Sequence, residues 1–304
     1  MTQKTLAVTG GTGFVGTTLI QLARKDGWHI RALTRAPQAA QNGVTWILGA
    51  LDDTQSLRAL VKGSDAVIHV AGVVNAADRA GFEAGNAAGT LGLIEAAREA
   101  RVNRFIHVSS LSAREPDLSN YGWSKAKAEQ FVKASGLDWT IVRPPAIYGP
   151  GDREMLDVYK MAKWGFALMP PKGQISLLEV SDLGRLLLAL IPADNARSEL
   201  YEADDGRDGA WTYESYGKAI GWALGKPITP ISMPPWLLSL AARGDQFFRR
   251  ERAKLTLDRV GYMCHPDWVI DVTKRPPADL WTPQVPTREG LKGTARAYRA
   301  AGWL

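Results

Sequence analysis

Short apolar runs alternate with longer amphipathic stretches through the first half of the chain. The apolar runs predict six strands, at residues 6–8, 29–33, 44–48, 66–70, 105–108 and 140–142. Helical patterns fill the gaps, notably over residues 15–23, 89–100 and 124–135. Continuous apolar strands separated by helices are typical of a parallel sheet covered on both faces. We therefore expect an α/β fold with a doubly wound parallel sheet and helices on both faces.

The pattern changes after Arg143, where prolines and tryptophans become frequent and the predicted elements shorten. This change predicts a main domain over residues 1–150. Residues 151–304 are expected to form mostly a smaller C-terminal lobe, with some elements returning to the main sheet. Because open α/β sheets bind ligands at the carboxyl ends of their strands, we expect the lobe to cap that edge and hold the substrate.

Composition narrows the class of protein. Apolar residues make up 45% of the 304 residues and charged ones 22%, which is typical of globular proteins. One cysteine, Cys264, excludes a disulfide framework and a cysteine-cluster metal site, and no metal is expected. The N-terminus runs into the first strand without a signal region, and the apolar run Leu186–Ile191 is too short to span a bilayer. These features predict a cytoplasmic protein.

The positive charge is concentrated toward the C-terminus. The chain carries 37 basic and 31 acidic residues, a net charge of +6. Residues 1–232 hold 25 basic and 24 acidic side chains, whereas residues 233–304 hold 12 basic and 7 acidic ones. No lysine or arginine block and no nucleic-acid signature is present, so we expect no nucleic-acid partner. The sequence does not indicate an oligomeric state.

A glycine-rich segment follows the first strand and opens the first helix. Gly10, Gly13 and Gly16 have the spacing TGxxGxxG. Glycines here let the backbone approach a pyrophosphate, which meets the unpaired N–H groups of the helix N-terminus. The sequence therefore predicts a Rossmann dinucleotide-binding domain. The expected cofactor contacts in this segment are Gly10, Thr12, Gly13, Phe14, Val15 and Gly16.

The end of the second strand indicates which dinucleotide is bound. An acid there would bind the ribose 2′-hydroxyl of NAD, whereas an arginine would accept the 2′-phosphate of NADP. Arg35 follows the second strand, and residues 29–41 contain no acid. We therefore favour NADP(H) over NAD(H), with a solvated surface arginine as the alternative. Asp52 and Asp53 are candidates for the adenine edge, although Asp53 could instead cap the next helix.

A tyrosine and a lysine form the second chemical motif. Tyr121 and Lys125 are four residues apart, so on a helix they share a face. A nearby cation favours the phenolate of a tyrosine, which makes Tyr121 a plausible acid or base for a hydroxyl or carbonyl group. Ser109 and Ser110 end the fifth strand at the same edge of the sheet, where a hydroxyl could bind the substrate oxygen.

Together these motifs resemble the extended and atypical branch of the short-chain dehydrogenase/reductase superfamily. This branch includes epimerase/dehydratase-like, complex I accessory-subunit-like and hydroxysteroid-dehydrogenase-like members. The resemblance covers nearly the whole chain. It rests on TGGTGFVG, HVAG at residues 69–72, Asn86 with Gly89 and Thr90, the serine pair, YGWSK and RPPAIYGPGD at residues 143–152.

The resemblance implies a role for each matching residue. Tyr121 would donate or accept the proton, and Lys125 would lower its pKa and bind the nicotinamide ribose. Ser110 would polarise the substrate oxygen, with Ser109 and Ser112 as weaker alternatives, and Asn86 would support the site. The further cofactor contacts implied by the resemblance are Ala71, Gly72, Pro144, Pro145 and Ile147.

The resemblance also implies a substrate. Dehydratases of the superfamily carry an acidic pair after the active-site hydroxyl, whereas Leu111 and Ser112 stand here, which argues against sugar dehydration. The C-terminal region resembles hydroxysteroid-dehydrogenase-like members, and the chain resembles bacterial ceramide-pathway reductases. This implies reduction of a ketone on a lipid-like small molecule, with 3-oxo-ceramide or a 3-ketosphingoid as candidates. The alternatives are a nucleotide-sugar epimerase or reductase and a non-catalytic NADP(H)-binding assembly or sensor protein.

Residues 234–257 predict an amphipathic helix that gathers Trp236, Leu237, Leu240, Ala241, Phe247 and Phe248 on one face. Basic residues fall elsewhere, which is typical of a helix lying on anionic lipid at the cytoplasmic face of a membrane. The alternative, slightly favoured, is a helix docked on its own domain. Gly244 argues against a long uninterrupted helix.

Overall fold

The computed structural model describes residues 3–250 and 253–304, which form two compact units. The first unit contains the described residues up to Arg143, together with Leu183–Glu202 and Pro276–Trp281. The second contains Pro144–Asp182, Ala203–Arg275 and Thr282–Leu304. The two units interleave along the chain, and the predicted division at residue 150 stays a prediction.

A seven-stranded parallel sheet forms the centre of the first unit, in the order β11-β6-β5-β4-β1-β2-β3. Its strands are β1 (Thr5–Thr9), β2 (His29–Thr34), β3 (Val44–Leu48), β4 (Ala66–His69), β5 (Arg104–Val108), β6 (Asp138–Arg143) and β11 (Glu199–Glu202). The first six match the predicted strands within two residues at each end. Their order reverses at β1, as in Rossmann domains, which confirms the predicted fold class.

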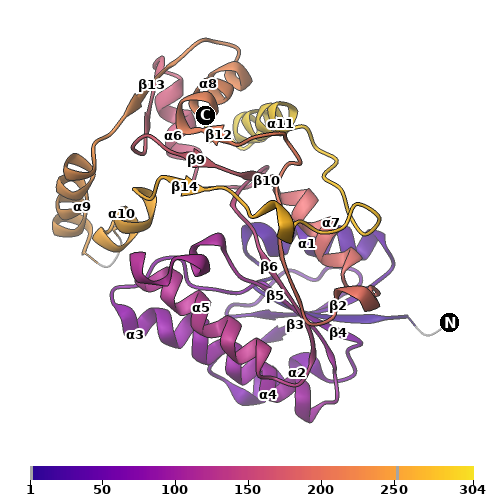
Figure 1. Ribbon diagram of the computed structural model, residues 1–304. Coiled ribbons are helices and arrows are strands. Elements are labelled where there is room, and N and C mark those ends of the chain that lie inside the picture. The colour runs from indigo at the N-terminus through magenta and orange to yellow at the C-terminus, as the bar shows by residue number, and fades with distance from the viewer. Residues whose placement is uncertain (1–2, 251–252) are drawn as a thin grey trace. The chain divides into compact units, whose positions relative to one another are not determined.

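Helices cover both faces of this sheet (Figure 1). On one face, α4 contacts α2 and α5. On the other face α1 packs on α7, where a Cβ added at Gly184 would lie 2.7 Å from Leu22. The helices of the unit are α1 (Phe14–Lys25), α2 (Thr54–Val61), α3 (Arg79–Phe82), η1 (Glu83–Ala88), α4 (Gly89–Glu99), η2 (Leu111–Arg114), η3 (Pro116–Leu118), α5 (Asn120–Lys133), α7 (Val180–Ala189, which begins in the second unit) and η4 (Asp194–Ala196).

The register of the sheet brings distant residues to one edge. β4 and β5 are buried along their whole length, as expected for strands covered on both faces. Thr9 pairs with His69, and His69 with His107 on the next strand. Since all strands run in the same direction, the segments that follow β1, β4 and β5 emerge side by side. This edge carries the predicted site residues of the first unit.

The second unit is built from short strands and helices. Strand β10 pairs with β7, β13 with β8, and β9 lies between β12 and β14. The aromatic rings of Tyr159 and Tyr298 meet edge to face, 5.1 Å apart, in its core. The elements are β7 (Ala146–Tyr148), α6 (Leu156–Ala162), β8 (Phe166–Met169), β9 (Gln174–Ile175), β10 (Leu177–Glu179), β12 (Trp211–Thr212), α8 (Tyr213–Leu224), β13 (Thr229–Ser232), α9 (Pro235–Arg249), α10 (Leu257–Met263), β14 (Asp267–Trp268), η6 (Val272–Lys274) and α11 (Thr287–Ala300).

Within the described ranges, no helix combines the length and the apolar character that crossing a bilayer requires.

Candidate active site

The glycine loop lies against the backbone that follows β4. Gly10 has a positive φ of 71°, and a Cβ there would lie 2.8 Å from the backbone nitrogen of Ala71. A Cβ on Gly16 would lie only 2.0 Å from the Gly10 carbonyl oxygen. Both positions therefore require glycine, because contacts this short exclude any side chain.

The helix that follows the loop has the features of a phosphate-binding end. Gly13 is the N-cap of α1, and the first turn of the helix contains no acidic residue. Thr12 and Gly13 are exposed, whereas Phe14 and Val15 are half-buried at the start of the helix. Unpaired N–H groups and the helix dipole favour a negative group at such an end. These residues fit the pyrophosphate of a dinucleotide.

The polar residues after the second and third strands differ in their contacts. Arg35 is exposed, directly after β2. Asp53 caps α2, since its carboxylate accepts a hydrogen bond of 3.0 Å from the backbone N–H of Gln55. Asp52 is exposed beside it. The capping role proposed for Asp53 is thus present, while cofactor contacts of Arg35 and Asp52 stay predictions.

The three serines after β5 are not equivalent. Ser109 is buried and donates its hydroxyl hydrogen to Glu129, at 2.6 Å, so this hydroxyl is already engaged. Ser110 caps η2, and its oxygen lies 3.2 Å from the Ser112 backbone nitrogen and 2.8 Å from the Ser112 hydroxyl. Ser110 is also less buried than its two neighbours. Among the three, Ser110 best fits a hydroxyl available to a substrate.

Helix α5 presents both members of the predicted acid–base pair. Ser119 caps the helix through the backbone N–H of Gly122, so that Tyr121 lies in the first turn and Lys125 one turn later. Lys125 is buried and donates a hydrogen bond of 2.8 Å to the Val108 carbonyl at the end of β5. Burial lowers the pKa of Lys125 from its ordinary value of 10.5 to about 8, and the negative charge of Glu129 opposes this effect.

Asn86 joins the segments around this lysine. It lies in the π-helical turn η1, a kind of turn that is frequent at functional sites. Its carbonyl oxygen accepts from the Val73 backbone at 2.6 Å, and its amide donates to Ser124 of α5 at 2.8 Å. A Cβ added at Gly72 would lie 3.1 Å from the Asn86 oxygen and 3.7 Å from the Lys125 nitrogen. Gly72, Asn86 and Lys125 are therefore brought together.

His69 is a buried connection that the sequence pattern did not reveal. The Thr90 hydroxyl donates its hydrogen to the backbone carbonyl oxygen of Asn86, at 2.5 Å, so it accepts the hydrogen on His69 Nε2, at 2.9 Å. His69 Nδ1 then accepts from the Thr9 hydroxyl at 2.6 Å. Burial, aided by the charge of Lys125, lowers the pKa of His69 to about 3, and the ring is neutral. It links the strand before the glycine loop to the turn that carries Asn86.

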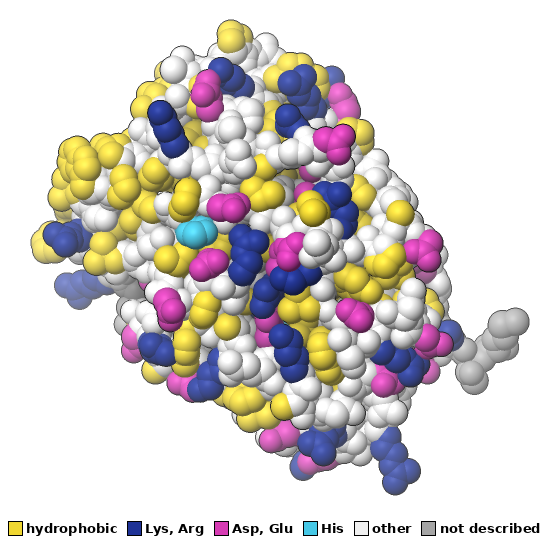
Figure 2. Space-filling model, in the orientation of Figure 1, with side chains coloured by type: hydrophobic (Ala, Val, Ile, Leu, Met, Phe, Trp, Pro, Cys, Tyr) yellow, Lys and Arg dark blue, Asp and Glu magenta, His cyan; other side chains and the backbone are white. Residues whose placement is uncertain are grey.

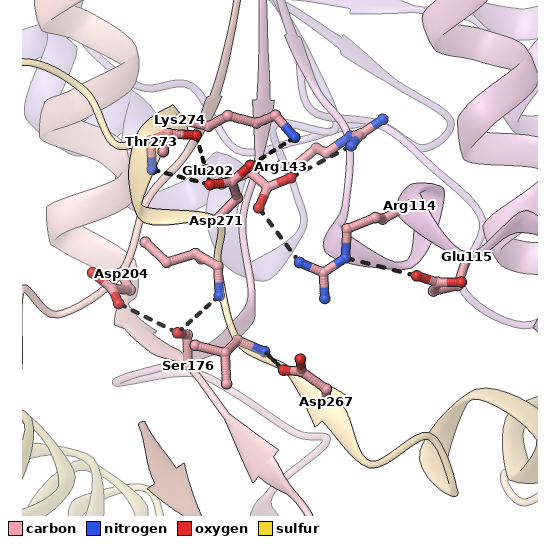
Figure 3. A network of polar contacts seen from close by, with 12 residues as sticks. Arg114, Glu115, Arg143, Ser176, Glu202, Asp204, Asp267, Asp271, Thr273 and Lys274 are labelled. Atoms are coloured by element: carbon pink, nitrogen blue, oxygen red, sulfur yellow. Dashed lines mark hydrogen bonds and ion pairs between the residues drawn. The ribbon is translucent and has the colours of Figure 1, made fainter. Parts of the chain in front are cut away.

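A buried ionic network holds Glu129 of α5, one turn beyond Lys125. Arg143, at the end of β6, holds Glu129 with two hydrogen bonds, of 2.8 and 2.7 Å. Arg143 and Arg114 also pair with Glu202, at 3.4 and 3.7 Å. Figure 3 shows both guanidinium groups directed at this carboxylate. Glu129 is one helical turn beyond Lys125, and this spacing is the signal in the sequence that could have identified it. The network holds the Glu129 carboxylate near the buried Lys125, whose pKa this negative charge raises.

The remaining predicted contacts belong to the second unit. Pro144 and Pro145 precede β7, and Ile147 lies within it. Their predicted place beside a nicotinamide stays a prediction. In the first unit, the structure brings the glycine loop, Ala71 and Gly72 together, and it gathers Asn86, Lys125 and the end of β5. Tyr121 is half-buried in the first turn of α5, with its ring centroid 6.2 Å from that of Phe82. Together with Lys125 and Ser110, it supplies the residue types that proton transfer at a carbonyl or alcohol oxygen requires.

The sequence is similar to a known protein family and to proteins of named activity. A family model described as NAD(P)H-binding matches residues 10–162. A protein named ceramide reductase from Caulobacter vibrioides is 34% identical over 98% of this chain and 96% of its own. A UDP-glucose 4-epimerase from Vibrio cholerae is 26% identical over the same shares of the two chains.

The fold also matches solved structures. The Bordetella bronchiseptica enzyme WbmH, solved in complex with NAD+, aligns over 99% of both chains with a TM-score of 0.76. The two sequences are 16% identical, so this match shows the shared fold alone.

Proposed function

The chain belongs to the extended short-chain dehydrogenase/reductase family of NAD(P)-dependent oxidoreductases, and on this premise we propose that it reduces a ketone on a hydrophobic, lipid-like molecule with NADPH. The observation that carries the substrate class is the 34% identity to a ceramide reductase, which extends over 98% of the chain. The candidate substrates are 3-oxo-ceramide and 3-ketosphingoid bases.

The residues of α5 and the neighbouring turn would carry the proton chemistry. When it is bound, the dihydronicotinamide supplies a hydride to the carbonyl carbon. Tyr121 gives its hydroxyl proton to the carbonyl oxygen, which becomes the alcohol. Ser110 donates a hydrogen bond to that oxygen, and the positive charge of Lys125 stabilises the tyrosinate left behind. Asn86 positions Lys125 by linking α5 to the backbone after β4.

Two finer features belong to the same proposal. Arg35 would bind the 2′-phosphate of NADPH, since it is exposed directly after β2 and residues 29–41 contain no acid to repel a phosphate. The protein would work in the cytoplasm, at the face of the membrane where lipid-like ketones are found.

The second candidate is nucleotide-sugar epimerisation, which the UDP-glucose 4-epimerase similarity favours. An epimerase would also retain the Tyr121–Lys125 pair, because it too moves a proton and a hydride at one carbon. A non-catalytic assembly or sensor role would not require the pair at all.

A substrate panel separates these functions. Purified protein is incubated with NADPH and either 3-oxo-ceramide or 3-ketosphinganine, and separately with NAD+ and UDP-glucose. The products are separated by chromatography before mass spectrometry, because a sugar epimer has the same mass as its substrate. We expect the alcohol from at least one of the two ketones and no change in the sugar. Untouched ketones would overturn the lipid proposal, and conversion of the sugar alone would establish the second candidate.

A further inference from the structure

Helix α9 docks on its own unit through a narrow strip. Leu238 and Ala242, one turn apart, are buried against Val260 of α10. Met233, Leu255 and Cys264 complete this small cluster. The helix runs through Gly244 and ends at Arg249, short of residue 257, where the predicted amphipathic helix was expected to end. The packed strip is not the apolar face that the helical pattern singled out.

That apolar face is exposed instead. The exposed fractions are 67% for Trp236, 60% for Leu240, 78% for Phe247 and 83% for Phe248. At 100° per residue these four side chains fall within an arc of roughly 120°. Figure 2 shows hydrophobic side chains gathered over α9. A contiguous exposed apolar surface of this kind marks an interaction site.

The charge around this face is positive. Residues 235–257 contain five basic and two acidic side chains, of which Glu251 and Arg252 lie outside the described residues. Arg243 borders the arc and is exposed, as is Arg250 at the end of the helix, whereas Arg249 lies on the side of Asp245.

The acid of the helix is engaged away from the apolar arc. Asp245 accepts hydrogen bonds from the backbone nitrogens of Lys254 and Leu255, at 2.8 and 2.9 Å. It also pairs with Arg249 at 3.3 Å. Asp245 therefore binds the segment that leads back to α10. Within the described part of this region, the exposed arc presents apolar side chains and positive charge.

We propose that this face of α9 is a docking surface for membranes that contain anionic lipid. The apolar side chains of Trp236, Leu240, Phe247 and Phe248 enter the interfacial region, while Arg243 and Arg250 meet lipid phosphates. The helix lies along the surface, since 15 residues span only about 22 Å, less than the hydrocarbon core of about 30 Å. A second copy of the chain is a poorer occupant, because its own arginines would be brought against these.

The evidence for the docking surface comes from α9 alone. The inference rests on the proposed function only in the kind of substrate that a membrane would supply. The experiment is flotation of the full chain, without NADPH or ketone, with vesicles of phosphatidylcholine alone or mixed with phosphatidylglycerol. We expect binding to the mixed vesicles and at least about tenfold less to the neutral ones. The double variant Phe247→Ser and Phe248→Ser should lose binding to both, and Arg243→Glu should lose it mainly to the anionic vesicles.

The matched control is Trp164→Ser, which removes another exposed aromatic side chain, 84% exposed and outside α9. Because all these side chains are exposed, the variants should keep the unfolding temperature of the wild type. Equal binding of the phenylalanine variant and the control would overturn the proposal. So would concentration-dependent self-association in sedimentation that the phenylalanine variant abolishes, since a second copy would then cover the face.

Reduction of a short-chain soluble ketone distinguishes the two failures. If vesicle binding is absent while ketones are reduced, the docking proposal is wrong and the proposed function stands. If the protein binds vesicles but reduces neither soluble nor lipid ketones, the proposed function is wrong and the docking surface stands.

Discussion

Replacing Lys125 with methionine should make the protein more stable and inactive. A pKa lowered from 10.5 to about 8 by burial means that the folded protein destabilises the charged lysine by about 3 kcal/mol. Methionine keeps most of the side-chain volume without the charge. The variant loses the hydrogen bond to the Val108 carbonyl, which costs about 1 kcal/mol. The expected net gain at pH 7 is therefore about 2 kcal/mol.

The pH dependence of this gain is the decisive part of the prediction. Between pH 8 and pH 10.5 the unfolded wild type binds the lysine proton and the folded one does not, so wild-type stability rises with pH relative to the variant. The extra stability of the Lys125→Met variant over the wild type should fall by about 2 kcal/mol between pH 7 and pH 9.5. Urea unfolding of both proteins across this range measures it. A variant that is less stable at pH 7, or a difference that does not change with pH, would refute the reasoning.

Three further changes test the cofactor loop, the coenzyme and the ionic network. Gly16→Ala places a Cβ 2.0 Å from the Gly10 oxygen and should weaken NADPH binding, measured by titration, by about 100-fold or more. The control Gly244→Ala, in open space within α9, should bind NADPH normally and gain up to about 1 kcal/mol in stability. Arg35→Ala should weaken NADPH binding about tenfold or more and leave NADH binding unchanged, and equal losses would contradict the coenzyme assignment. Glu129→Gln removes a charge that raises the pKa of Lys125, so the loss of turnover at alkaline pH should begin at a lower pH than in the wild type. An unmoved profile would show that Glu129 does not act through Lys125.

The first six strands could be predicted because parallel strands buried on both faces leave continuous apolar runs in the sequence. β11 could not, since Glu199–Glu202 begins and ends with glutamate. Its place beside β6 comes from backbone pairing with a strand far earlier in the chain, in which Glu202 lies opposite Arg143, 59 residues away. The two- and three-residue strands of the second unit are too short to produce any periodicity.

The candidate site divides in the same way. The glycine loop and the Tyr121–Lys125 spacing are local patterns that the sequence displays directly. The neutral state of His69 follows from its burial and the nearby charge of Lys125, and its hydrogen bonds go to Thr9 and Thr90, which lie 60 and 21 residues away. For α9, helical spacing identified the residues that share a face, but only the contacts of Leu238 and Ala242 show that the opposite strip is buried.

The central claim is that Tyr121 supplies the proton for reduction of a ketone at this site. The most direct measurement is single-turnover consumption of NADPH by the wild type and by Tyr121→Phe, with saturating 3-oxo-ceramide in mixed micelles. We predict that the variant binds NADPH with unchanged affinity and reacts about 100-fold or more slowly, because it lacks only the hydroxyl. Equal rates in the two proteins would contradict the account.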